Sequence, residues 1–203
     1  MSQLDFYFST ISPYTYLALP RFRALVEARG LAVTWKPFDI MALYARSGGT
    51  PVGQRPQARQ DYRLADIARQ AKRAGLPIHV QPAHFPTNAA PASYAIIAAQ
   101  KAAAETGSGD LPGLVEAVLR ACWAEQKNIA EDAVITAALE AAGFDPGLAM
   151  SGLFTGAETY GRNLEEAVVA GVFGAPSFVT EDGAVFWGQD RLDDLADHLD
   201  GAG

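Results

Sequence analysis

The hydroxyl group of Ser12 is the first candidate for chemistry in this sequence. Ser12 is followed directly by Pro13 and then by an apolar helical pattern, an order typical of a helix N-cap with proline at the first helical position. At such a position the unpaired backbone N–H groups and the helix dipole favour an anion. Two explanations stay open, because Ser12 either caps the helix alone or also contacts an anionic group.

The surroundings of Ser12 and the rest of the sequence exclude several other kinds of site. No G-x-S-x-G motif surrounds Ser12 and no histidine base is evident, which argues against a serine hydrolase. The three histidines match no metal-ligand spacing, so we expect no metal. The single cysteine, Cys122, excludes an intrachain disulfide and a CxxC pair. Its apolar helical context predicts a buried, inert thiol.

Three arginines form a second candidate feature. Arg55, Arg59 and Arg63 are four residues apart, a spacing that places them on one face of a helix predicted at residues 56–74. A solvated helix face explains this pattern, and so does a cationic wall that attracts an anionic substrate. The glycine-rich loop at residues 47–53 precedes this helix and can cover the end of the fold that holds Ser12.

The composition limits the possible partners and location. The chain has 203 residues, of which 49% are hydrophobic, and a net charge of -7. Such a charge argues against nucleic acid as the main partner. No apolar run is long enough for a membrane span, and no basic region precedes a signal-like apolar stretch. We therefore expect a cytoplasmic protein that binds neither nucleic acid nor membranes.

Strand patterns occur only near the two ends of the sequence. Residues 6–8 and 31–36 flank the first helix, and such a unit favours parallel strands. Residues 174–180 and 184–187 are joined by Asp182-Gly183, a hairpin turn signal. Helical patterns fill the middle, and a last helix ends the chain. Helices are predicted at residues 56–74, 91–105, 114–125 and 131–142. A further helix ends at about residue 171, and the last helix has Leu192, Leu195 and Leu199 on one face.

This order of elements, with Pro176 entering the third strand, resembles the thioredoxin fold, in which that proline is cis. The predicted fold class is α/β: a thioredoxin-like domain of residues 1–40 and 172–203, interrupted by an inserted all-helical domain of residues 41–171. Redox members of this fold begin their first helix with Cys-x-x-Cys. Here no sulfur stands at either end of residues 12–15, and disulfide exchange needs a thiolate.

Several stretches resemble the 2-hydroxychromene-2-carboxylate isomerases, which are related to kappa-class glutathione transferases. The matching stretches span nearly the whole chain, with clear motifs at both ends and a looser match in the middle. They are residues 5–18, 171–178 and 186–192, and more loosely 61–66 and 75–77.

The resemblance implies glutathione as cofactor and a role for each matching residue. Ser12 would contact the glutathione sulfur, and Ala175, before Pro176, would pair through its backbone with the cysteinyl part. The γ-glutamyl end would be held by the third motif, in which Asp190 suits its ammonium group. Core packing also explains the tryptophan of that motif, and a helix cap also explains Asp190. The motif residues are Trp187, Gly188, Gln189 and Asp190.

The substrate side of the resemblance is less complete. Many relatives have an asparagine in the loop that aligns with residues 47–53, where this chain has Gly48-Gly49-Thr50. Phe85 falls where some members place an aromatic residue against the substrate ring. The further substrate candidates, by position alone, are Tyr44, Gln54 and Arg59.

The activity implied by the resemblance is glutathione-dependent isomerisation of 2-hydroxychromene-2-carboxylate to trans-o-hydroxybenzylidenepyruvate, in aromatic hydrocarbon catabolism. The substrate would be a small aromatic carboxylate, and a homodimer is expected because relatives commonly form dimers. Two alternatives stay open. In the first, the protein acts as a kappa-like glutathione transferase or peroxidase on another electrophile. In the second, it binds peptides at the cis-proline groove without catalysis.

Overall fold

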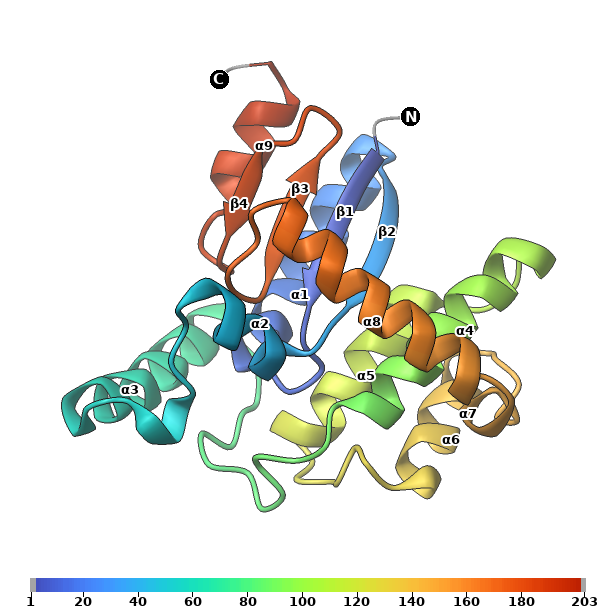
Figure 1. Cartoon of the computed structure of the whole chain (residues 1–203), viewed down its shortest axis with the longest axis horizontal. Coiled ribbons are helices and arrows are strands. Elements are labelled where there is room, and N and C mark those ends of the chain that lie inside the picture. Colours follow the sequence, from blue (N-terminus) through green and yellow to red (C-terminus); the bar gives the residue numbers. More distant parts are fainter. Residues whose placement is uncertain (1–2, 202–203) are drawn as a thin grey trace.

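A four-stranded mixed sheet organises the computed structural model, which describes residues 3–201 (Figure 1). Its strands are β1 (Gln3–Phe8), β2 (Ala32–Pro37), β3 (Ser177–Thr180) and β4 (Val185–Trp187), in the order β2-β1-β3-β4. β1 and β2 are parallel, whereas β3 is antiparallel to both of its neighbours. The predicted strand-helix-strand unit and the predicted hairpin are both confirmed.

Alternation along the strands separates the two faces of the sheet. Leu4, Phe6 and Phe8 point to one face, where they pack with helix α1 (Pro13–Arg29) and helix α9 (Leu192–Leu199). Tyr7 points to the other face and packs in a second, smaller cluster. Because successive side chains of a strand point to opposite faces, apolar residues next to one another in β1 bury both faces of the sheet.

Helix α8 (Leu153–Val169) covers this second face together with α2 (Ile40–Ser47). Figure 1 shows α8 crossing in front of the sheet while α1 lies behind it. The remaining helices gather beside the sheet, and the predicted helices match the observed ones within a few residues. Helix α2 was not predicted from the sequence. The others are α3 (Gln57–Ala74), α4 (Ala90–Thr106), α5 (Leu111–Trp123), α6 (Asp132–Ala141), α7 (Leu148–Ser151) and the short 3-10 turn η1 (Val52–Gln54).

The larger hydrophobic cluster runs through both predicted segments of the chain. Leu4 and Phe178 of the sheet belong to the same cluster as Leu119 and Trp123 of α5. The division into residues 1–40 with 172–203 and residues 41–171 therefore stays a prediction. No helix within residues 3–201 has the length and apolar character needed to cross a membrane.

Candidate functional site

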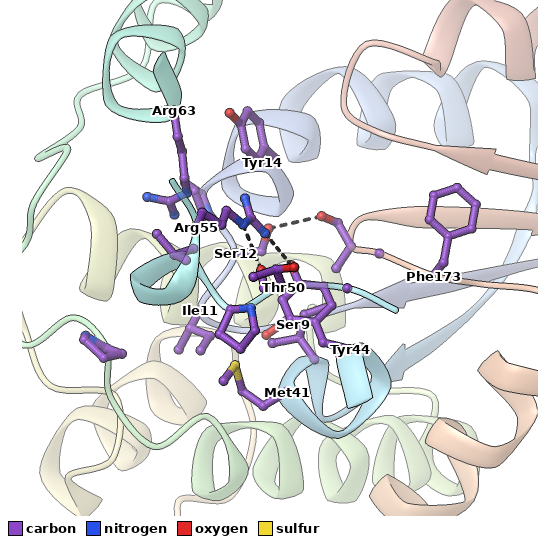
Figure 2. A pocket seen from close by; sticks show the side chains of 18 of the residues that line it. Ser9, Ile11, Ser12, Tyr14, Met41, Tyr44, Thr50, Arg55, Arg63 and Phe173 are labelled. Carbon is purple, nitrogen blue, oxygen red and sulfur yellow. Dashed lines mark hydrogen bonds between the residues drawn. The ribbon is translucent and has the colours of Figure 1, made fainter. Parts of the chain in front are cut away.

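A cavity of about 690 Å³ lies where the first turn of α1 meets α2, the loop after α2 and the start of α3 (Figure 2). The loop at residues 47–53 forms one wall, as the sequence analysis expected. The segment that leads to β3 closes the opposite side. Six of the predicted site residues line this cavity: Ser12, Tyr44, Arg59, Phe85, Ala175 and Trp187.

Ser12 is the N-cap of α1, and its hydroxyl group has two partners. Its Oγ accepts a hydrogen bond from the backbone N–H of Thr15 at 3.2 Å. The same hydroxyl donates to the carbonyl oxygen of Ala175 at 3.4 Å, across 163 residues of sequence. The cap therefore uses a lone pair of Oγ, and the proton is directed at the carbonyl of Ala175, which also lines the cavity. Pro13 occupies the first turn, as predicted.

The segment before β3 brings Ala175 to Ser12. The Ala175–Pro176 peptide bond is cis, as predicted. The backbone N–H of Gly188 donates to the carbonyl of Pro176 at 2.9 Å, so the end of β4 is tied to this segment. Pro176 is itself buried and is not a lining residue.

The motif at the end of β4 lies at the rim of the cavity. Trp187 is 50% exposed and meets Phe173 edge-on, with ring centroids 4.8 Å apart. Its indole lies against Gly174, where a Cβ atom would come within 2.3 Å of Trp187 Nε1. Core packing therefore does not explain Trp187. Asp190 is exposed, pairs with Arg191 at 3.2 Å and provides no cap for α9.

The structure leaves five of the predicted residues outside the lining. Because these residues do not line the cavity, their predicted roles stay predictions. They are Gln54, Pro176, Gly188, Gln189 and Asp190.

The wall formed by Tyr44 depends on the glycine that follows it in the loop. A Cβ atom at Gly49 would lie 2.2 Å from Cδ1 of Tyr44, so only glycine lets the loop pack against that ring. Arg55 lies over the ring of Tyr44, with its Cζ atom 5.9 Å from the ring centre. It donates to the carbonyl of Thr50 at 2.8 Å and to the hydroxyl of Tyr44 at 3.4 Å.

The three arginines all line the cavity but differ in burial. Arg59 is exposed, whereas Arg63 is only 8% exposed, so a solvated helix face does not describe Arg63. Among the described residues, no aspartate or glutamate lines the cavity. The cavity therefore carries a positive charge although the chain as a whole has a net charge of -7.

Tyr14 extends the first turn of α1 toward α3. Its hydroxyl group donates to Oδ2 of Asp66 at 2.9 Å. Burial and this hydrogen bond raise the pKa of Tyr14 above its ordinary value. Tyr14 therefore stays protonated. Asp66 is shared between Tyr14 and Arg69, which pairs with it at 3.6 Å and does not line the cavity.

Comparison with known proteins agrees with this architecture. A family model described as a DSBA-like thioredoxin domain matches residues 3–200. The chain belongs to this family. The predicted thioredoxin-like fold is thereby confirmed.

Relatives within the DSBA-like family have the names that the sequence motifs suggested. A 2-hydroxychromene-2-carboxylate isomerase of Pseudomonas putida is 29% identical, over 93% of this chain and 90% of that protein. Glutathione S-transferase kappa 1 of Caenorhabditis elegans is 30% identical, over 98% and 91%. A solved structure of 2-hydroxychromene-2-carboxylate isomerase superimposes with a TM-score of 0.76 at 25% identity, over 98% and 95% of the two chains. These relatives support an enzyme of the isomerase or transferase type, and the predicted resemblance is confirmed.

Two hydroxyl groups of this DSBA-like chain fit a ligand that carries a sulfur anion. The Oγ atom of Ser9 is buried, lines the cavity and has no hydrogen-bond partner within residues 3–201. The hydroxyl of Ser12 reaches only one weak acceptor, at 3.4 Å. Both are donors beside a helix N-terminus, which is a suitable environment for a thiolate.

Sequence reasoning missed Ser9 and did not choose Arg63 as a substrate contact. Ser9 lies three residues before Ser12 in the same motif, and this proximity was the available signal. Arg63 lies one turn after Arg59, so the four-residue spacing pointed to both. The exposed fraction of the side chain distinguishes Arg63 from Arg59. This fraction depends on residues far away in the sequence.

Proposed function

We propose that this protein is a glutathione-dependent isomerase that interconverts 2-hydroxychromene-2-carboxylate and trans-o-hydroxybenzylidenepyruvate. The observation that carries the proposal is the hydroxyl of Ser12, which faces a cationic cavity at a helix N-terminus. The only cysteine, Cys122, is buried and is not a lining residue. A thiol for this site therefore has to come from a bound molecule.

The residues of the first turn would hold and activate that thiol. A free thiol has a pKa of about 8.5 and is mostly protonated at neutral pH. The hydroxyl of Ser12 donates a hydrogen bond to the sulfur, and the unpaired N–H groups of α1 favour its charged form. When bound, glutathione supplies a thiolate that adds reversibly to the conjugated double bond of the α,β-unsaturated keto acid formed on ring opening, so that the resulting single bond can rotate before elimination restores the double bond.

The rest of the predicted glutathione site follows the motifs of the resemblance. The backbone of Ala175, before Pro176, would pair with the cysteinyl part of the tripeptide. The residues at the end of β4 would hold the γ-glutamyl part, with Asp190 at its ammonium group. The residues of this group are Trp187, Gly188, Gln189 and Asp190.

The opposite wall would bind the small aromatic carboxylate. A cationic side chain such as Arg59 pairs with the carboxylate, and Phe85 lies against the aromatic ring. Tyr44 and Gln54 complete the proposed set. We place the reaction in aromatic hydrocarbon catabolism in the cytoplasm, where glutathione keeps thiols reduced. The partners on this proposal are the substrate and a second copy of the chain, with no nucleic acid or membrane.

The variant Ser12→Ala tests the proposal. It should fold, with a loss of about 1 kcal/mol from the missing cap. Losing the hydrogen bond to a charged sulfur removes roughly 1.5–3 kcal/mol of thiolate stabilisation. The pKa of bound glutathione should therefore rise, and turnover at neutral pH should fall by about one to two powers of ten.

The measurement is a pH titration of thiolate absorbance together with isomerase rates, with Ser12→Thr as the variant that keeps a hydroxyl. An unchanged thiol pKa and unchanged turnover in Ser12→Ala would reduce Ser12 to a helix cap.

A kappa-like glutathione transferase or peroxidase is the second candidate function. It is favoured by the 30% identical kappa-class relative and by Gly48-Gly49-Thr50, which replaces the asparagine of many isomerases. Conjugation of 1-chloro-2,4-dinitrobenzene without turnover of the chromene acid would select this candidate. Peptide binding without turnover of either compound would instead select a non-catalytic binding protein.

A further inference from the structure

Arg63 is a buried cation that has no ion-pair or hydrogen-bond partner within residues 3–201. Its side chain enters the cavity from α3 (Figure 2) and is 8% exposed. Within residues 3–201, no carboxylate lies within ion-pair distance of it, and no oxygen accepts a hydrogen bond from it. By contrast, Arg21, Arg23, Arg29 and Arg46 each pair with an acidic side chain.

The aromatic ring of Phe85 lies beside this guanidinium group, where an acidic side chain would be expected. Its Cζ atom lies 5.5 Å from the centre of the Phe85 ring, and Phe85 is itself held by Trp123, with ring centroids 5.0 Å apart. Asp66, the acidic residue on the next turn of α3, is occupied by Tyr14 at 2.9 Å. Arg63 therefore packs beside the ring of Phe85, and within residues 3–201 its N–H donors have no acceptor.

Burial of a cation without an anionic partner is unfavourable. Burying a charged group costs free energy unless it is paired. Burial lowers the pKa of Arg63, and the nearby charge of Arg55 lowers it further. A ligand anion beside the guanidinium would offset this cost.

We infer that Arg63 binds the carboxylate of the substrate, with the conjugated part of the substrate lying against Phe85. This inference deepens the proposed function, on which it rests for the identity of the substrate. An arginine offers two parallel N–H donors that match the two oxygens of a carboxylate. Arg59 is exposed, and exposed ion pairs contribute little to binding. Arg63 is therefore the main anchor and Arg59 a secondary one.

Binding of two probes without glutathione tests this assignment. Benzylidenepyruvate carries the carboxylate, and benzylideneacetone is the neutral enone with the same ring. Titration calorimetry should show that the wild type binds benzylidenepyruvate more tightly than the ketone. Arg63→Met should weaken binding of the carboxylate by about 10- to 100-fold, the range expected for hydrogen bonds to a charged group, and leave the ketone unaffected.

Two further variants distinguish the effect of the paired guanidinium donors on binding from the effect of the positive charge alone. Arg63→Lys keeps the charge without the paired donors and should give intermediate affinity. Arg73→Met removes an exposed arginine of the same helix that does not line the cavity, and it should bind both probes as the wild type does. A wild type that does not prefer the carboxylate, or an Arg63→Met variant that binds it unchanged, would overturn the inference.

Thermal unfolding distinguishes a binding role from a structural one. Because Arg63→Met removes an unpaired buried charge, its Tm should equal or exceed that of the wild type. A lower Tm together with equal loss of both probes would assign Arg63 to the structure and overturn the inference. The probes need neither glutathione nor turnover, so an inactive isomerase with Arg63-dependent carboxylate binding would contradict only the proposed function.

Discussion

Position 12 combines a helix cap with a donor directed at the cavity. Ser12 Oγ accepts from the backbone of Thr15 and donates to the carbonyl of Ala175. A thiol at this position would meet the same N–H groups and the same positive charge. The local environment therefore suits a sulfur anion, whichever molecule provides it.

The variant Ser12→Cys makes this property measurable without any ligand. The new thiol should have a pKa below the usual value of about 8.5, so iodoacetamide should label it rapidly at pH 7. Cys122 serves as the internal control, because burial raises the pKa of its thiol to about 12. The native wild type should stay unlabelled and react only after denaturation. A new thiol with an ordinary pKa would show that the site has no preference for an anion.

The wall at Tyr44 depends on the absence of a side chain at one loop position. Gly49→Ala would place a Cβ atom 2.2 Å from Tyr44 Cδ1, so the ring has to move. We expect a several-fold increase in KM for the carboxylate substrate with little change in Tm. Gly161→Ala is the matched control, because its Cβ would meet nothing within 4 Å on α8. Unchanged kinetics in Gly49→Ala would separate Tyr44 from substrate binding.

At the scale of elements, Lys36 connects the parallel strands to α8. Its Nζ donates to Asp5 at 2.6 Å and to Glu166 at 2.8 Å. Burial alone lowers the pKa of Lys36, but the hydrogen bonds to Asp5 and Glu166 and the contact with Tyr7 together outweigh burial and raise the pKa above its ordinary value. The charge of Lys36 therefore holds β2, β1 and α8 together.

Lys36→Met should lower the free energy of unfolding by about 1–2 kcal/mol, because it removes the ion pair of Asp5 and leaves Glu166 with only its longer contact to Arg162. Urea unfolding measures this change. Arg162→Met is the control on α8, since Arg162 reaches Glu166 only at 4.0 Å and is 57% exposed. Its loss should be below about 0.5 kcal/mol. Equal losses in both variants would contradict a special role for Lys36.

At the scale of the whole molecule, a single core joins the sheet to the helical segment. Phe178 of β3 and Leu195 of α9 belong to the same cluster as Leu119 of α5 and Leu139 of α6. Neither segment could unfold without exposing apolar surface of the other.

We therefore expect one cooperative thermal transition for the whole chain. In differential scanning calorimetry, the ratio of the calorimetric to the van't Hoff enthalpy should be close to one. Two resolved transitions would instead support separate domains at residues 1–40 with 172–203 and at residues 41–171.

The sequence by itself determined the features that depend on neighbouring residues. Ser12 and Pro13 start α1 because a cap uses backbone groups only three residues away. Asp182-Gly183 turns the chain between β3 and β4 for a similarly local reason. The ordered motifs also indicated the family, because they retain the residues at both ends of the thioredoxin-like unit.

Only the tertiary structure decided which candidate residues meet. The spacing of Arg59 and Arg63 is regular, yet one is exposed and the other is covered by Phe85 from a distant loop. Trp187 is half exposed at the rim, and its indole packs against the backbone of Gly174, where no side chain stands in the way. Burial and cavity walls arise from contacts between elements far apart in the sequence. The spacing of residues along one element does not predict those contacts.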